Sequence, residues 1–226
     1  MKNAKTHILN KTFDKVYVFN LDRRKDRWEG CKKIIDSTGL QLERMSAVDG
    51  LALKEEDLVM GLLDYIPRND LRGMQGCTMS HYNAIKKAKD KGHKNVLVFE
   101  DDFEFVDNFE ELFTEYYAQV PHDWEFLYLG ANHNFHMGAR LPMVSKNVGK
   151  PFRSYCAHAY AVKESLYDFV LSLFDVKVTG TPGDVALAQA QPNMKNCYTL
   201  FPSLVTQRDG YSDIMCKDAS YKPYIL

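Results

Sequence analysis

The sequence lacks the features that define several large classes of protein. No apolar run in its 226 residues approaches the ~18 residues that a membrane span needs, and no apolar segment follows the N-terminal lysines, so a secretory signal is not expected. There is no internal repeat and no low-complexity tract. Basic residues (29) and acidic residues (30) nearly balance to a net charge of -1, which argues against a general nucleic-acid binder.

Cysteine is too sparse and too irregular to form a structural scaffold. The five cysteines are odd in number and contain no Cys-x-x-Cys pair, so neither a disulfide framework nor a zinc knuckle is indicated. We expect most of them to be small buried side chains in a reducing compartment. The hydrophobic fraction of 45% is that of a globular protein. The length predicts one domain over 1–226, with a core of about 14–213 and a C-terminal tail over 214–226.

Short runs of β-branched and aromatic residues alternate with amphipathic segments along the chain. Strands are predicted at 16–19, 42–48, 96–99, 126–129, 154–162 and 197–201. Helices are predicted after a capping Asp22, over 54–63 and 76–91, from 109 after a capping Asn108, and over 163–174. This alternation predicts an α/β layer fold with a mostly parallel sheet. The irregular stretch 131–151 is long enough to be a functional loop.

Three consecutive carboxylates follow the clearest predicted strand. Glu100, Asp101 and Asp102 come directly after 96–99. In an open α/β sheet, ligands bind beyond the carboxyl ends of the strands, and adjacent carboxylates raise the cost of ionising one another. A divalent cation would relieve that repulsion, and carboxylate oxygens suit Mn²⁺ or Mg²⁺ shared with a substrate phosphate. The alternative is a solvated acidic turn.

A basic segment follows the first predicted strand. Residues 20–27 include Arg23, Arg24, Lys25 and Arg27. Arginines at a strand end and helix start can hold a diphosphate through paired N–H donors, and the amides of the helix start add to this. Taken alone, the segment is better interpreted as a capped helix with a solvated charged face.

Two glycine-containing segments place polar groups near predicted helix starts. In 76–81, Gly76 allows close backbone approach, while Ser80 and His81 supply hydrogen-bonding groups. They are not a nucleophile–base pair, because neighbours on a helix point about 100° apart; a half-buried, satisfied histidine is the alternative. In 180–184, Asp184 can cap a helix and, at the mouth of a cleft, can also act as a general base.

The polar segment 202–213 has two interpretations. It either folds back over another part of the molecule or is an unordered tail.

Taken in order, these segments resemble glycosyltransferase family 25, which includes lipooligosaccharide galactosyltransferases and collagen hydroxylysine galactosyltransferases. The segments that carry the resemblance are Val18–Arg27, Ala47–Gly50, Gly76–His81, Leu97–Asp102, Trp124–Gly130, Ala157–Tyr160, Asp184 and Pro202–Gln207. The resemblance extends from about Val16 to Asp213. One departure is the stretch 73–76, which lacks the acidic residue that the family often carries between these glycines.

The resemblance implies a GT-A-like α/β fold with a mostly parallel central sheet, and an inverting transfer of a hexose from a UDP-sugar. Galactose is the first choice of sugar and glucose the second, the acceptor being a hydroxyl of a glycan such as lipooligosaccharide. Asp102 is the expected Mn²⁺ or Mg²⁺ ligand, with Glu100 as a metal or ribose contact and His158 as a further metal or phosphate contact. Asp184 is the candidate base. Donor contacts are expected from Asn20, Arg23, Arg27, Asp49, Gly50, Ser80, His81, Glu100 and Asp101.

Other functions are compatible with the same sequence. One is a non-catalytic module that binds a nucleotide sugar, against which the intact acidic triplet argues. Another is a transferase acting on hydroxylated protein side chains or modified nucleic-acid bases; the near-neutral charge speaks against nucleic acid. We expect the acceptor side in 131–150. We also expect a cytoplasmic protein without a transmembrane segment, and leave peripheral association with the inner face of a membrane open.

Overall fold

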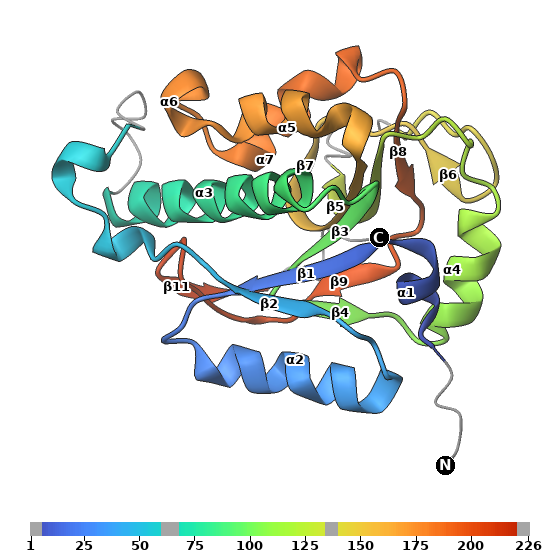
Figure 1. Cartoon of the computed structure of the whole chain (residues 1–226), viewed down its shortest axis with the longest axis horizontal. Helices are drawn as coiled ribbons and strands as arrows, with labels where there is room; N and C mark the ends of the chain where they lie inside the picture. The colour runs from blue at the N-terminus through green and yellow to red at the C-terminus, as the bar shows by residue number, and fades with distance from the viewer. Residues whose placement is uncertain (1–5, 60–67, 134–139, 221–226) are drawn as a thin grey trace.

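The computed structural model describes residues 6–59, 68–133 and 140–220. A seven-stranded sheet in the order β2-β1-β3-β7-β5-β8-β6 forms its centre (Figure 1). The strands are β1 (Lys15–Asn20), β2 (Glu43–Ser46), β3 (Asn95–Glu100), β5 (Phe126–His133), β6 (Val148–Gly149), β7 (Ser154–Lys163) and β8 (Cys197–Leu200). Strands β2, β1, β3, β5 and β8 run in one direction, and β7 and β6 run against them. The predicted α/β class with a mostly parallel central sheet is confirmed.

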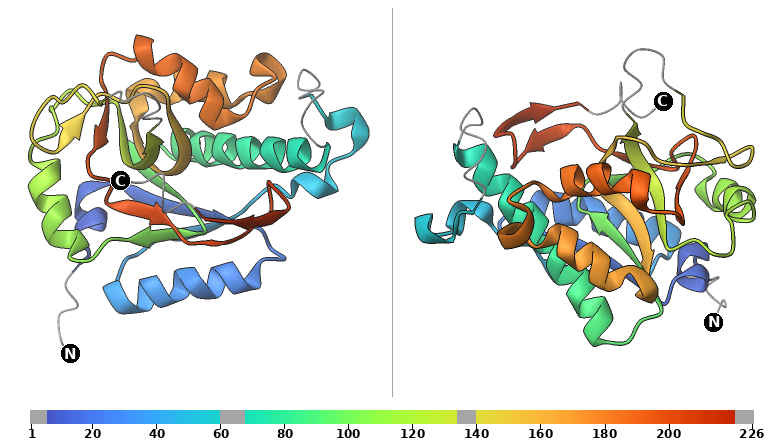
Figure 2. Two further views of the ribbon diagram at one scale, coloured as in Figure 1. Left: turned by 180° about the vertical axis from the view of Figure 1, so that it is seen from behind. Right: turned by 90° about the horizontal axis from the view of Figure 1, so that it is seen from above.

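Helices cover the two faces of this sheet. The α-helices are α1 (Ile8–Thr12), α2 (Lys25–Thr38), α3 (Arg68–Asp90), α4 (Phe109–Tyr117), α5 (Tyr167–Phe174), α6 (Val176–Thr179) and α7 (Gly183–Ala190). Short 3-10 turns occur at η1 (Gly50–Ala52), η2 (Glu55–Asp57), η4 (Glu164–Leu166) and η5 (Gln191–Asn193). Helices α3, α5 and α7 lie on one side of the sheet and α2 on the other (Figures 1 and 2). No helix in the described ranges is long and apolar enough to cross a membrane.

Alternate residues of β3 show why both faces are covered. Leu97 and Phe99 pack into one buried cluster with α4, while Val96 and Val98 pack into another with Ile85 of α3. All four strand side chains are fully buried. Each face of the central strand therefore contributes to a separate hydrophobic core, as expected of a strand between two helical layers.

Two small two-stranded sheets contain the C-terminal strands. Strand β4 (Phe103–Phe105) pairs with β9 (Val205–Gln207), and β10 (Gly210–Ser212) pairs with β11 (Lys217–Ala219) as a hairpin. Figure 2 shows this C-terminal part folded against the central sheet. The interpretation of 202–213 as an unordered tail is therefore wrong. The division of the chain into a core and a tail at 213/214 stays a prediction, although it falls inside the hairpin.

The predicted helix start at Gly76 is wrong, because α3 already contains Arg68–Gln75. Gly76 and Gly73 are helical, and their lack of a side chain serves packing. A Cβ on Gly76 would lie 2.6 Å from the Val48 carbonyl oxygen, and one on Gly73 would lie 2.8 Å from the Ile214 Cα. These glycines let other backbone segments approach the helix closely.

The helix predicted over 54–63 is also wrong where it can be compared. Only Glu55–Asp57 forms a 3-10 turn, and Leu58 is extended; 60–63 lie outside the described residues. The segment has no buried face, so little packing supports a helix there.

Two predicted helix caps are wrong as well, and a third is right in position only. The N-cap of α2 is Arg24, and Asp22 instead accepts hydrogen bonds from Arg44 and Ser46. Asn108 is the N-cap residue of α4 as predicted, but it has a left-handed conformation and makes no side-chain cap bond. Pro182, not Asp184, is the cap residue of α7. Strand β5 also continues past its predicted end at Gly130, where the register shifts.

Candidate active site

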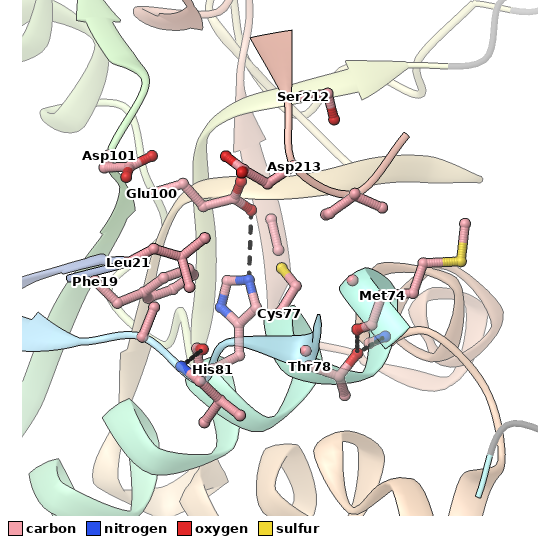
Figure 3. Close-up of a pocket in the computed structure, with 18 of the residues that line it drawn as sticks. Phe19, Leu21, Met74, Cys77, Thr78, His81, Glu100, Asp101, Ser212 and Asp213 are labelled. Carbon is pink, nitrogen blue, oxygen red and sulfur yellow. Dashed lines mark hydrogen bonds and ion pairs between the residues drawn. The ribbon is translucent and has the colours of Figure 1, made fainter. Parts of the chain in front are cut away.

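A cavity of about 350 Å³ lies at the carboxyl ends of β1, β2 and β3. Its walls come from these strand ends, the η1 turn, α3, the start of α7 and the segment joining β10 to β11 (Figure 3). It is lined by most of the predicted site residues: Arg23, Arg27, Asp49, Gly50, Ser80, His81, Glu100, Asp101, Asp102 and Asp184. The fold thus brings together residues that are up to 161 positions apart in the chain, from Arg23 to Asp184.

The three carboxylates of the triplet have different surroundings. Asp101 is fully engaged: its Oδ2 accepts from Asn20 Nδ2 at 2.6 Å, and its Oδ1 accepts from Arg27 Nη1 at 2.7 Å. Asp102 is held less tightly, with Arg27 Nη1 at 3.1 Å and Gln207 Nε2 at 3.3 Å. Asp102 therefore keeps more capacity for a ligand than Asp101.

Glu100 is the last residue of β3, and its carboxylate points toward α3. Its Oε1 lies 3.4 Å from His81 Nε2, the contact drawn as a dashed line in Figure 3. Asp101 and Asp102 follow the strand, and the Asp101 side chain binds Asn20 and Arg27.

Burial makes ionisation of the whole triplet costly. Burial, with further repulsion from Asp101 and Asp184, raises the pKa of Glu100 to about 7. Burial and the Glu100 charge raise the pKa of Asp102 to about 6. Burial also raises the pKa of Asp101, although the Arg27 guanidinium opposes this. Another cation would stabilise the ionised triplet, which agrees with the repulsion expected from the sequence.

The basic residues form ion pairs around the same cavity. Arg23 donates from Nε to Asp49 Oδ2 at 2.8 Å and from Nη1 to Asp213 Oδ1 at 2.6 Å. Arg24 also pairs with Asp213. The acid partners raise the pKa of the Arg23 guanidinium further above its usual range. The basic segment is thus neither a simple solvated helix face nor a set of free cations.

Ser80 ties α3 to the segment after β2. Its Oγ donates to the Gly76 carbonyl at 2.8 Å and accepts the Val48 N–H at 2.9 Å. With the close approach at Gly76, this fixes the turn that carries Asp49 and Gly50 at the cavity wall.

The ring of His81 is fixed on three sides. It is buried, with ring centroids 4.6 Å from Phe19 and 5.2 Å from Phe174. Its Nδ1 lies 3.1 Å from Tyr160 Oη. Burial lowers the pKa of His81 to about 3, so the ring is neutral at pH 7. The predicted alternative was a half-buried, satisfied histidine. The ring is instead buried, and its Nε2 faces the Glu100 carboxylate.

Asp184 reaches the cavity from the first turn of α7. Its Oδ1 accepts the Val185 N–H at 2.9 Å, and its Oδ2 accepts the Cys156 N–H at 3.3 Å. The helix begins here because Pro182 sets an extended entry and the Gly183 N–H bonds to Thr78 Oγ1 at 2.9 Å. A carboxylate anchored by backbone amides in this way has a defined position at the cavity.

Two predicted site residues are not brought to the cavity wall. Asn20 is buried, and its amide is used by Asp101, Arg44 and the Arg24 carbonyl. The Nε2 of His158 lies 3.1 Å from the Val205 carbonyl oxygen, and its Nδ1 is buried without a partner. Their predicted contacts with donor and metal stay predictions.

Sequence reasoning offered folding back as one interpretation of the C-terminal segment but named no site residue in it. The Arg208 backbone N–H donates to the Asp102 carbonyl at 2.8 Å, and its guanidinium donates to the Asp101 carbonyl at 2.6 Å. Ile214 and Met215 line the cavity. Asp213 forms ion pairs with Arg23 and Arg24. Gln207 falls in a segment that carries the family resemblance. Nothing in the sequence distinguishes Arg208 and Asp213 from ordinary surface charges.

Comparisons with known proteins agree with the resemblance. A model of glycosyltransferase family 25 (LPS biosynthesis protein) matches residues 13–183. A human procollagen galactosyltransferase 2 is 30% identical over 129 residues, which are 52% of this chain and 21% of that protein. A human protein named inactive glycosyltransferase 25 family member 3 is 35% identical over 130 residues, 52% of this chain and 22% of that protein. The matched part is thus about a fifth of each relative.

One solved structure resembles the chain more distantly. A glycosyltransferase involved in the glycosylation of the major capsid of PBCV-1 aligns with a TM-score of 0.45 and 10% identity, over 81% of this chain and 78% of that one. A likeness of this size carries no argument about function.

Proposed function

The chain belongs to glycosyltransferase family 25, and from this we propose that it transfers a hexose from a UDP-sugar to a hydroxyl group of a glycan. Galactose is the first candidate sugar and glucose the second. The observation that carries the proposal is the single cavity wall on which arginines, an acidic triplet and the separate carboxylate Asp184 meet. We propose that the protein acts in the cytoplasm, on glycan acceptors such as lipooligosaccharide.

The donor side of the cavity has groups for each part of a UDP-sugar. Phe19, Leu21, Ala47 and Val48 provide apolar wall for a base. Arg23 and Arg27 provide the N–H donors that a diphosphate accepts. Both arginines already donate hydrogen bonds to carboxylates, so the oxygens of a bound diphosphate would replace carboxylate oxygens as their acceptors.

The residues of the triplet fit a divalent cation. Carboxylate oxygens are the ligands that Mn²⁺ and Mg²⁺ prefer, and the raised pKa values of Glu100 and Asp102 indicate a site short of positive charge. Asp102 and Glu100 would hold the ion, since the hydrogen bonds to Asp102 (3.1 and 3.3 Å) are longer than those that Asn20 and Arg27 donate to Asp101 (2.6 and 2.7 Å). When bound, the ion supplies charge neutralisation for the departing UDP.

The chain's own residues then account for the proton and the leaving group. Asp184 takes the proton of the acceptor hydroxyl as that oxygen bonds to the anomeric carbon. The bond between this carbon and the diphosphate oxygen breaks on the other face, and UDP leaves with the electron pair. Arg27 and Arg23 bind the developing diphosphate charge. The sugar configuration is inverted because attack and departure are on opposite faces.

The direct test is a panel of UDP-sugars offered with and without Mn²⁺, monitored for slow UDP release. We expect release from UDP-galactose or UDP-glucose that depends on Mn²⁺ and is lost on Asp102→Ala, with the variant still folded. Turnover retained in that variant would remove the metal assignment.

A non-catalytic nucleotide-sugar module is the second candidate, because one of the relatives is named as inactive. It would bind a UDP-sugar without releasing UDP in the presence of any acceptor. The buried triplet argues for chemistry, since clustered carboxylates are costly to keep when nothing uses them. The same panel distinguishes the two functions.

A further inference from the structure

The cavity holds a second cluster of metal-binding groups, which shares Glu100 with the proposed carboxylate site and adds a thiol and an imidazole. Cys77 Sγ, His81 Nε2 or Nδ1 and a Glu100 carboxylate oxygen all lie within 4.8 Å of one another. From this juxtaposition we propose that the cavity contains a site for a thiophilic divalent cation such as Zn²⁺, bound by Cys77, His81 and Glu100.

The fold places these three side chains by separate and simple means. Cys77 and His81 are four residues apart on α3, so their side chains lie on one face of the helix. Glu100 ends β3 and points at that face, with its Oε1 3.4 Å from His81 Nε2. Figure 3 shows the thiol beside the imidazole and below the carboxylate.

The imidazole is prepared to act as a ligand through one nitrogen. Tyr160 Oη occupies Nδ1 at 3.1 Å, and Phe19 and Phe174 hold the ring plane. Metal-bound histidines characteristically have such a partner on the other nitrogen, which fixes tautomer and orientation. Only Nε2 then remains, and it faces Glu100.

The chemistry of the set distinguishes it from the site proposed for Mn²⁺. Thiolate and imidazole are ligands of Zn²⁺ and Co²⁺, whereas Mg²⁺ prefers oxygen alone. Three protein ligands with the cavity on the fourth side match an open zinc site. With metal–ligand bonds of about 2.0–2.3 Å, the ligand atoms of a tetrahedral ion lie about 3.3–3.5 Å apart. The 3.4 Å between His81 Nε2 and Glu100 Oε1 already fits this, and the remaining pairs lie within 4.8 Å. Binding displaces the thiol proton to solvent and changes no oxidation state.

The cavity also provides a matched control. Cys156 is a second half-buried thiol on its wall, in the same cavity but outside the cluster. Replacing Cys77 or Cys156 by serine removes one thiol from the same cavity, and only the first removes a predicted ligand.

The experiment titrates the chain with Co²⁺ and follows the sulfur-to-metal charge-transfer absorption, then displaces Co²⁺ with Zn²⁺. We expect one ion per chain, retained in excess Mg²⁺ and in Cys156→Ser, and a loss of Zn²⁺ affinity of about 100-fold or more in Cys77→Ser. No charge-transfer band in the natural chain, an equal band in Cys77→Ser, or loss of the band in Cys156→Ser would overturn the proposal.

A second measurement needs no variant and covers the case in which Cys77→Ser does not fold. Iodoacetamide labelling with peptide mapping should show Cys77 protected by one equivalent of Zn²⁺ while Cys216, which is exposed, stays reactive. Equal labelling of Cys77 with and without Zn²⁺ contradicts the site. Neither experiment uses a sugar nucleotide, so the result does not depend on the proposed transferase function.

Discussion

Replacing Asp102 by asparagine should make the metal-free chain more stable while abolishing UDP-sugar turnover. Asp102 is 4% exposed, and burial together with the Glu100 charge raises its pKa from 3.8 to about 6. At pH 8 this corresponds to about 3 kcal/mol of disfavoured ionisation, which the neutral amide avoids. The raised pKa of Asp102 already includes the opposing attraction of Arg27, so losing that attraction in the asparagine variant adds no separate cost.

Thermal unfolding followed by circular dichroism in EDTA at pH 8 measures this effect. For a chain of 226 residues, about 3 kcal/mol corresponds to an increase in Tm of roughly 6–12 °C. The same variant should lose about 10²–10³-fold or more of its turnover, as expected when a group that stabilises transition-state charge is removed. Glu104→Gln, two residues away and exposed, should change neither quantity. A lower Tm for Asp102→Asn, or retained turnover, would refute the reasoning.

Three further predictions test other parts of the site and fold. Asp184→Asn should bind a UDP-sugar as the natural chain does but lose transfer to an acceptor, as measured by calorimetry and a UDP-release assay; unchanged transfer would place the base elsewhere. Gly76→Ala should cost at least about 3 kcal/mol in urea unfolding, because its Cβ would lie 2.6 Å from two backbone atoms; an unchanged midpoint contradicts the packing described. Burial lowers the pKa of His133 from its usual value of about 6.5 to about 4. Between these two pH values the unfolded chain therefore binds a proton at this ring and the folded chain does not. The stability that this ring contributes is present above pH 6.5 and lost as the pH falls, and between pH 8 and pH 5 the natural chain should lose about 2 kcal/mol more than His133→Gln. Equal losses would show that His133 binds the proton in both states.

The sheet was predictable because its strands carry a strong local pattern. Runs such as 96–99 have no polar interruption, and such a run has few alternatives to a buried strand. The position of the acidic triplet followed at once, because it comes directly after that strand. The family resemblance then placed Asp49, His81 and Asp184 in one site, and the structure lines one cavity with them.

Other features depend on contacts that no local pattern carries. The start of α3 was placed at Gly76, although the helix already contains Arg68–Gln75. The close backbone approach expected at Gly76 is that of the segment 48–50, but the extent of the helix before this glycine had no local signal. The role of Asp213 depends on a hairpin that returns to Arg23 and Arg24 from the other end of the chain. Long-range ion pairs of this kind have no spacing rule in the sequence.

Our central proposal is that the buried acidic triplet binds a divalent cation, and that a UDP-sugar needs this cation in order to bind. Isothermal titration of UDP into the chain, with and without Mn²⁺, tests it most directly. We predict tight binding only with Mn²⁺, and no Mn²⁺ effect in Asp102→Asn. Binding of the same strength in EDTA, or the same Mn²⁺ effect in the variant, would contradict the account.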